Sequence, residues 1–391
     1  SEESFGLFGG ESSMKPELQD VFRLYGDEFR KTHRLPMNQL KTMSAIETCR
    51  SSSQGGHLDE CDSCGYVRIS YNSCRNRHCP KCQGLAKERW LLERERDLLQ
   101  VGYFHVVFTI PDSLNPIVLR NQKVVYSILF KAAAETLAEL ALDPKYLGAQ
   151  IGIITVLHTW GQNLLDHPHL HCIIPGGGLS LDGTRWLQSK KKFFLPVKVV
   201  SRKFRGKFLA YLKEAYHGNK LVFPGQIKPL GDKRSFQDLL NRLYQLEWVF
   251  YCKKPFKSPW YVLNYLGRYT HRVALTNNRI LDVSEGNVTF NWRDYRDNHK
   301  PKVMTLDAQE FIRRFLLHVL PKRFVKIRHY GFLSNRNRNK KLRLCQRLTH
   351  SKVREALPKL SATELLKKLT GIDLTICPSC ALVSHFAPVT Q

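Results

Sequence analysis

Three histidines, His167, His169 and His171, lie within five positions of the segment LLDHPHLHCIIP at residues 164–175. The segment is short, rich in branched apolar residues and followed by glycines, which is typical of a buried strand. Residues two apart on a strand project from the same face, so His169 and His171 would point to one side together. Two parallel imidazoles can hold one divalent metal ion. The alternative is a pair of ordinary strand histidines satisfied by hydrogen bonds.

Gln162 is the candidate third ligand of such an ion. If the chain turns near residues 164–166, pairing of the two flanking strands brings Gln162 opposite the region of His169. Two nitrogen ligands and one oxygen ligand leave coordination positions open for a phosphate oxygen. Metal-assisted cleavage of a phosphodiester requires such open positions.

Two tyrosines supply a candidate nucleophile in the segment WYVLNYLGRYTHR at residues 260–272. The apolar spacing of this segment suits a helix, and Tyr265 and Tyr269 are four apart, so both phenols would share one helical face. A tyrosine hydroxyl can attack phosphorus when a metal neutralises the phosphate charge. The alternative is two aromatic core residues at helical spacing.

Eight residues of zinc-ligand type lie between Cys49 and Cys82. Two C-x-x-C pairs separated by 14 residues have close to the spacing of a zinc ribbon. We predict two structural zinc ions: one held by Cys61, Cys64, Cys79 and Cys82, the other by Cys49, His57, Cys74 and His78. The alternative is a single ion, with both histidines on the surface. A further C-x-x-C at Cys377 and Cys380 lacks a clear second pair, and His385 or Cys345 could contribute to a third site.

The charge of the chain predicts a polyanionic partner. Lysine and arginine total 61 against 34 acidic residues, a formal net charge of +27. Because the excess positive charges repel one another unless a polyanion binds, nucleic acid is the expected partner. Basic residues around the cysteines, and basic residues interleaved with aromatics in residues 324–344, are the candidate DNA contacts: Arg75, Arg77, Lys81, Arg336 and Arg338. The sequence has no apolar run of membrane-spanning length and no signal-peptide pattern, so we expect a cytoplasmic protein without membrane contacts.

The elements that must position these residues follow one another as strand, helix, strand and strand. They are expected at residues 103–111, about 117–142, 148–160 and 164–175. This order predicts an α+β fold with a central antiparallel sheet flanked by helices. Residues 84–100 have the apolar spacing of a helix. Beyond Arg272, short strand-like runs with hairpin turns precede a helix from Asp307 to Pro321.

Taken together, the motifs resemble a known family. HPHLH matches the His-hydrophobe-His motif of the HUH endonucleases, FTIP at residues 108–111 resembles their first motif strand, and YLGRY matches the helix of their two-tyrosine class. The cysteine block with SCRNRHCPKCQ, together with HTWGQ, HPHLH and PGGG, resembles the rolling-circle transposases of the insertion-sequence-ninety-one family. The resemblance extends from about Cys49 to Arg272.

The resemblance implies a reaction and its participants. His169 and His171, with Gln162, would bind Mg2+ or Mn2+. Tyr265 and Tyr269 would attack single-stranded DNA of the transposon ends and target, leaving a 5′-phosphotyrosine and a free 3′-hydroxyl, and driving rolling-circle transposition. Arg268 would steady the phosphate. The sequence leaves open the DNA sequences read, the order of the tyrosines and the oligomeric state.

The sequence is expected to divide into three domains. We expect a helical and zinc-binding DNA-binding domain at residues 1–100, an HUH two-tyrosine nuclease domain at 101–275, and a basic C-terminal region with DNA contacts at 276–391. Two other functions remain open at this point. A replication initiator or relaxase would use the same chemistry without needing the zinc block, and a non-enzymatic zinc DNA-binding regulator would explain the charge and cysteines but not the histidines and tyrosines.

Overall fold

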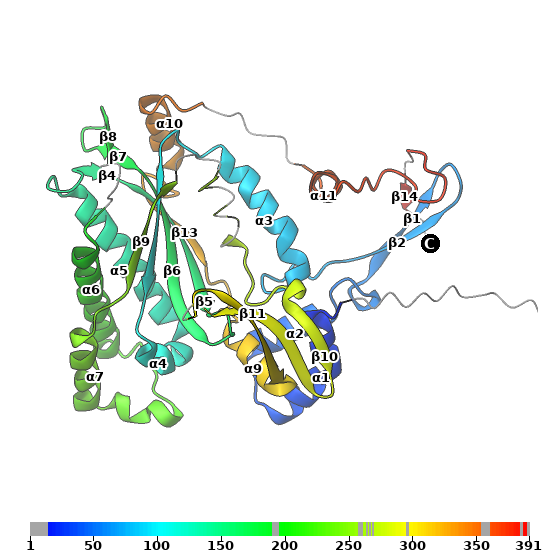
Figure 1. The fold of residues 1–391 in the computed structure, drawn as a ribbon, viewed down its shortest axis with the longest axis horizontal. Coiled ribbons are helices and arrows are strands. Elements are labelled where there is room, and N and C mark those ends of the chain that lie inside the picture. Colours follow the sequence, from blue (N-terminus) through cyan, green and yellow to red (C-terminus); the bar gives the residue numbers. More distant parts are fainter. Residues whose placement is uncertain are drawn as a thin grey trace, which may run out of the picture.

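A computed structural model of the chain describes residues 15–189, 195–256, 261, 262, 265, 267, 270–294, 297–352, 360–383 and 386–388. It confirms the predicted α+β class, with helices packed around antiparallel sheets (Figure 1). No helix in the described parts of the chain is both long and apolar enough to span a lipid bilayer.

A five-stranded antiparallel sheet in the order β13-β5-β6-β3-β9 forms the centre of the molecule. Its strands are β3 (Tyr103–Thr109), β5 (Gly152–Trp160), β6 (Asp166–Pro175), β9 (Phe250–Phe256) and β13 (Ile327–Gly331). The expected strands at 103–111, 148–160 and 164–175 are therefore present. The middle strand β6 contains the three histidines and is hydrogen-bonded on both sides, so its side chains are held at fixed positions on the two faces of the sheet.

Helices cover one face of this sheet and bury its apolar side chains. The covering helices are α5 (Gln122–Leu142), α6 (Val197–His217) and α7 (Lys233–Gln245), which lie together on one side of the sheet in Figure 1. Leu170 and Cys172 of β6 are fully buried in this core, among the rings of Phe108 and Phe204. The residues that alternate with them, His169 and His171, must therefore face the opposite side.

The helix expected from about residue 117 to 142 is divided in two. A short helix, α4 (Asn115–Arg120), is separated from α5 at Asn121, whose φ of −128° and ψ of 33° are not helical. The Asn121 side chain donates to the carbonyls of Ile117 and Val222 and accepts from the Val222 amide. These bonds to a distant loop hold the break, which local helix propensity does not predict.

The N-terminal helices pack against a segment from the other end of the chain. Two helices, α1 (Leu18–Thr32) and α2 (Met37–Glu47), share a buried core with a three-stranded sheet and a helix, namely β10 (Ile280–Ser284), β11 (Asn287–Asp294), β12 (Lys300–Asp307) and α9 (Ala308–Leu317). The rings of Phe22 and Phe315 meet edge to face at 5.5 Å. The predicted boundary at residue 275 thus lies within a region where both ends of the chain meet, and β13 adds a further C-terminal segment to the central sheet.

The remaining elements form two smaller sheets and their connections. One sheet has the order β14-β1-β2 and pairs the two ends of the chain, at β1 (Gly56–Cys61), β2 (Val67–Tyr71) and β14 (Phe386–Pro388). The other has the order β4-β7-β8, at β4 (Ala149–Gln150), β7 (Gly177–Ser180) and β8 (Trp186–Gln188). Other helices among the described residues are α3 (Pro80–Glu95), α10 (Arg338–Leu348) and α11 (Ala362–Thr370), with short 3-10 turns at 52–54, 112–114, 225–231 and 277–279. Figure 1 shows α11 and β14 beside β1 and β2, away from the central sheet.

Candidate active site and zinc-binding clusters

Three histidines converge on the face of the central sheet that α5 and α6 leave uncovered. His158 of β5 pairs in register with His169 of β6, and His171 follows two residues later on the same face. Ring nitrogens of the three side chains lie within 4.8 Å of one another. His158 and His171 are almost fully buried, with 2% and 8% of their surface exposed. Three imidazoles at this separation form a candidate site for one divalent metal ion.

The protonation of His169 suits it to bind a metal. Its Nδ1 lies 2.6 Å from the His167 carbonyl, which can only accept, so Nδ1 carries the proton and Nε2 keeps its lone pair. Burial, with the nearby His167 charge, lowers the pKa of His169 to about 3. Burial and the charge of His158 also hold the pKa of His171 well below its usual range. These imidazoles are therefore neutral near pH 7, the form that binds metals.

A chain of two hydrogen bonds connects this cluster to Tyr265. The Nδ1 atom of His171 lies 2.9 Å from Nε2 of His105, and Nδ1 of His105 lies 2.9 Å from the Tyr265 hydroxyl. His105 is buried on β3, and burial, followed by the charge of Lys253, lowers its pKa to about 4. The Lys253 ammonium lies 5.4 Å from the centre of the Tyr265 ring. The phenol is thus held beside the histidine cluster by a neutral imidazole and a lysine.

The sequence prediction missed His158, the third histidine of the cluster, and His105, which connects the cluster to Tyr265. Gln162 lies in the turn between β5 and β6, where its backbone carbonyl accepts a 2.6 Å hydrogen bond from Arg279. His167 is outside the cluster, 3.9 Å from the Asp112 carboxylate. The predicted catalytic residues Arg268 and Tyr269 lie outside the described residues.

A first four-cysteine cluster joins the end of α2 to the start of α3. It consists of Cys49, Cys74, Cys79 and Cys82. The sulfur of Cys82 lies 3.6 Å from the sulfurs of Cys49 and Cys74, and the sulfur of Cys79 lies 3.7 Å from that of Cys49. A tetrahedral zinc ion with Zn–S bonds of about 2.3 Å separates its sulfurs by about 3.8 Å, whereas a disulfide brings them to about 2.05 Å. The spacing fits zinc.

A second four-cysteine cluster joins the two ends of the chain. Cys61 and Cys64 meet Cys377 and Cys380, with sulfur separations of 3.9 Å from Cys61 to Cys380 and 3.7 Å from Cys64 to Cys377. This spacing also fits a tetrahedral zinc site.

The two C-x-x-C turns of the second cluster are built alike. In each, the amide of the first cysteine donates to the carbonyl five residues on, and its carbonyl accepts from the amide four residues on. The residue four positions on has a positive φ in both turns, 72° at Gly65 and 58° at Ala381. Equivalent turns therefore present two thiolates each from opposite sides of the cluster.

The predicted partition of the zinc ligands needs correction. The structure groups Cys79 and Cys82 with Cys49 and Cys74, because the β1–β2 hairpin carries Cys61 and Cys64 away from them. Neither histidine belongs to a cluster. His57 is exposed near Asp59, and Nε2 of His78 accepts from the Leu320 amide at 3.4 Å.

The predicted DNA-binding residues differ in what they contact. Arg75 and Arg336 are exposed. Arg77 donates to the carbonyls of Pro321 and Phe324 and is partly buried. Lys81 forms an ion pair with Glu17, and Arg338 forms one with Asp97. Arg77, Lys81 and Arg338 therefore also stabilise contacts within the chain.

Comparisons with known proteins identify the family of the chain. Residues 152–341 match a family model described as "Putative transposase", and residues 21–110 match one described as "Transposase zinc-binding domain". These matches define the chain as a transposase with an N-terminal zinc-binding domain, and its substrate is DNA. The chain is 51% identical over 373 residues to "Putative transposase y4qJ" of Sinorhizobium fredii, covering 93% of each protein.

A second relative is more distant. The chain is 28% identical over 353 residues to the "Transposase for insertion sequence element IS801" of Pseudomonas savastanoi pv. phaseolicola, covering 88% of this chain and 82% of that protein. No solved structure matches the chain. The chain belongs to the IS91 family of transposases.

Proposed function

We propose that this transposase is an HUH-type single-stranded DNA endonuclease and strand transferase, with Tyr265 as a nucleophile. The observation that carries the proposal is the hydrogen-bonded chain from Tyr265 through His105 to His171, which places a phenol beside three converging histidines. A tyrosine with a purely structural role needs only one hydrogen-bond partner for its hydroxyl. It does not need a neighbouring cluster of neutral metal-binding side chains.

His158, His169 and His171 would hold Mg2+ or Mn2+. The donor set fits a divalent ion, since the three imidazoles converge and His169 has a free Nε2 lone pair. When bound, the ion would neutralise the charge of the scissile phosphate and leave positions open for its oxygens. Gln162 remains a candidate for an additional ligand from the neighbouring turn.

His105 would orient the Tyr265 hydroxyl. A neutral imidazole has one donor nitrogen and one acceptor nitrogen. If His171 offers Nε2 to the metal, its protonated Nδ1 donates to Nε2 of His105, and His105 then donates from Nδ1 to the Tyr265 oxygen. This hydrogen bond and the Lys253 ammonium would both stabilise negative charge on the phenol oxygen as its proton leaves.

The reaction exchanges one phosphate ester for another. The Tyr265 hydroxyl gives up its proton to solvent and its oxygen forms a bond to phosphorus. The bond from phosphorus to the 3′-oxygen breaks, and that oxygen takes up a proton from solvent to become a free 3′-hydroxyl. The 5′-phosphotyrosine that remains can then be attacked by a 3′-hydroxyl during strand transfer. Tyr269 and Arg268 are proposed as the second nucleophile and a phosphate contact, which together allow rolling-circle transposition.

Zinc would be structural in both four-cysteine clusters. We propose one ion on Cys49, Cys74, Cys79 and Cys82, and a second on Cys61, Cys64, Cys377 and Cys380. The matching zinc-binding domain model supports the first, and the spacing of the sulfurs supports both. Structural zinc stabilises small modules that bury little apolar surface.

The test is formation of a covalent protein–DNA adduct on labelled single-stranded DNA from the ends of the element. With Mn2+ present, the wild-type chain should form an adduct that survives denaturing electrophoresis. Tyr265→Phe should abolish it, because the ring still packs but has no hydroxyl to attack. Tyr261→Phe is the matched control, since Tyr261 lies four residues earlier and is 65% exposed.

The same assay orders the two tyrosines. Tyr269→Phe should still form the first adduct but fail to complete strand transfer. An adduct that persists in Tyr265→Phe would show that another residue makes the first attack. Persistence in the Tyr265→Phe/Tyr269→Phe double variant would contradict the mechanism as a whole.

A further inference from the structure

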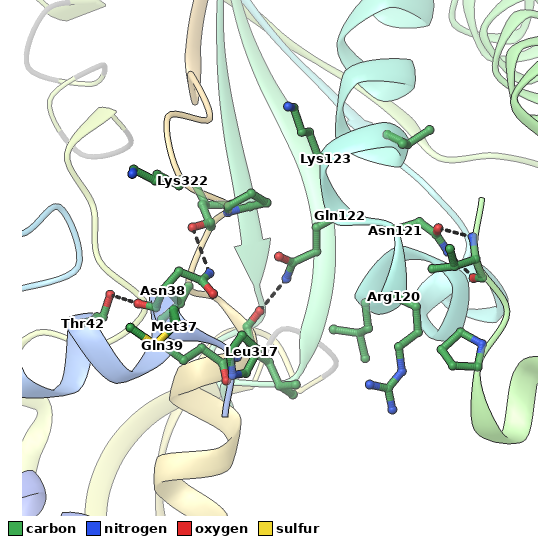
Figure 2. Close-up of a pocket in the computed structure, with 18 of the residues that line it drawn as sticks. Met37, Asn38, Gln39, Thr42, Arg120, Asn121, Gln122, Lys123, Leu317 and Lys322 are labelled. Carbon is green, nitrogen blue, oxygen red and sulfur yellow. Dashed lines mark hydrogen bonds between the residues drawn. The ribbon is translucent and has the colours of Figure 1, made fainter. Parts of the chain in front are cut away.

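A large groove lies between the N-terminal helices and the central domain, on the side of α4 and α5. It has a volume of about 1640 Å³, and its walls come from α2, from the loop before α3, from α4 and the start of α5, from residues 220–227, and from α9 and the segment after it. Figure 2 shows Met37, Gln122, Lys123, Leu317 and Lys322 around it. Small-molecule pockets measure roughly 300–1,000 Å³, so the groove is larger than such a ligand needs.

Every lysine, arginine, aspartate or glutamate position in the described lining of this groove is occupied by a lysine or an arginine. Nine lysines and arginines line it, and no aspartate or glutamate does. Acidic residues make up about a third of the charged residues of the chain, so composition alone does not explain their absence. Seven of the cations are exposed and form no ion pair within the described residues: Arg34, Lys41, Arg120, Lys123, Lys220, Lys322 and Arg323. The groove is therefore suited to a polyanion.

Two helices begin at the wall of the groove and add to its positive potential. Met37 opens α2 and Gln122 opens α5. Neither helix has a side-chain cap on its first amides, and neither has an acidic residue in its first turn. The positive end of a helix dipole favours a phosphate group, so both starts reinforce the charge of the lysines and arginines.

Hydrogen bonds across the groove hold its walls in place. The Gln122 side chain donates to the Leu317 carbonyl at 3.0 Å, and Asn38 donates to the Leu320 carbonyl (Figure 2). Asn115, which also lines the groove, donates to the carbonyl of Asp166, the first residue of β6. The groove therefore opens next to the start of the strand that contains His169.

The type of DNA follows from what else lines the groove. Sites for single strands combine positive charge with aromatic side chains on which the bases stack. No phenylalanine, tyrosine or tryptophan is among the described lining residues. Amide side chains such as Asn38 and Gln122, which suit hydrogen bonds to phosphate and sugar, are present instead. We propose that this groove binds the phosphate backbone of a DNA duplex adjoining the single strand that is cut, an inference that rests on the proposed function.

The test compares duplex and single-stranded binding by two matched triple variants of the zinc-loaded chain. Arg120→Gln, Lys123→Gln and Arg323→Gln remove three groove cations. Arg202→Gln, Lys213→Gln and Arg242→Gln remove three exposed cations outside the groove. Fluorescence anisotropy with a labelled duplex, and with a single strand of the same length, is measured over a range of salt concentrations.

The groove variant should bind the duplex at least about tenfold more weakly, and the slope of log affinity against log salt should decrease by about 2 to 3. The control variant should change neither the duplex affinity nor the salt slope by a comparable amount. Equal effects of the two variants on duplex binding would overturn the proposal, as would a loss confined to the single strand. The groove variant should still form the Tyr265 adduct on a short single strand that contains only the cut site, so loss of duplex binding and failure of the nucleophile assignment remain distinguishable.

Discussion

His158 and Gln162 differ in how firmly the backbone holds them beside His169. His158 is on β5 and pairs directly with His169, so its ring is positioned by a strand that is hydrogen-bonded on both sides. Gln162 lies in the connecting turn, with its carbonyl held by Arg279. A ligand on a rigid strand loses less conformational freedom on binding a metal than one on a turn. We therefore expect His158 to contribute more of the metal affinity.

His158→Ala should weaken Mn2+ binding by at least about tenfold, because it removes one of three converging nitrogens. Gln162→Ala serves as the matched control and should change the affinity by much less. Isothermal titration of the zinc-loaded chain with Mn2+ measures both, and unchanged zinc content shows that the fold is retained. A larger loss of Mn2+ affinity in Gln162→Ala than in His158→Ala would show that the third ligand is Gln162 in the turn.

The sequence could predict which residues of β6 share a face, but not which residues of its neighbours stand beside them. Alternation along one strand places His169 and His171 together, as the structure shows. Whether His158 or Gln162 lies opposite His169 depends on the length of the turn and on a register shift between His158 and Trp160. His105 comes from a strand more than 60 positions earlier, and only the sheet order β5-β6-β3 brings it to the site.

At the scale of elements, the second cluster shows why the sequence alone does not assign the C-x-x-C motif at Cys377 to a metal site. The turn at Cys377 has no second pair near it in the sequence, because its partner turn begins at Cys61. Nothing local distinguishes such a half-site from an isolated motif. By contrast, the strands at β3, β5 and β6 were predictable from apolar runs, and the break at Asn121 was not, since it depends on a contact with Val222.

Cys377→Ser should reduce the zinc content from two ions per chain to one, because it removes one of the four thiolates of the second cluster. It should also make the β1–β2 hairpin and the α11 segment more sensitive to proteolysis. Cys252→Ser, at a half-buried cysteine outside both clusters, is the control. Zinc content is measured by atomic absorption after gel filtration. Two ions per chain in the Cys377→Ser variant would remove this cysteine from the ligand set.

At the scale of the whole molecule, neutral histidines that are buried or half-buried link stability to pH. Burial lowers the pKa of His271, His318 and His329 to about 4 each. In the unfolded chain these groups titrate near about 6.5, so between the two values the unfolded chain binds more protons. Their contribution to stability is therefore full above about pH 6.5 and is lost as pH falls towards 4. Asp166 acts in the opposite direction, because burial raises its pKa to about 6.

The melting temperature should therefore fall as pH is lowered from 7.5 to 5, since three histidines outweigh one carboxyl group. For fully buried His318 alone, the loss by pH 4 amounts to at most about 3 kcal/mol. Differential scanning fluorimetry, over the range in which zinc content is constant, measures the decline. His329→Gln should make it shallower, whereas His217→Gln on the exposed end of α6 should not. A melting temperature that is constant or rises towards pH 5 would contradict this account.

Whole-molecule packing was the least accessible to sequence reasoning. The charge of the chain and its apolar runs indicate a folded DNA-binding protein, and the α+β class followed from element order. The contact of α1 and α2 with α9, however, joins segments about 280 residues apart and leaves no local pattern. The same packing forms the basic groove, whose lining residues come from both ends of the chain and from its middle.

The pairing of the Cys61 turn with the Cys377 turn also has a consequence for biosynthesis. The hairpin emerges from the ribosome early, but its cluster can be completed only after more than 300 further residues have been translated. A chain that ends before Cys377 would therefore keep Cys61 and Cys64 as a pair of thiols without their partners. Completion of the second cluster thus distinguishes a chain translated past Cys380 from one truncated before Cys377.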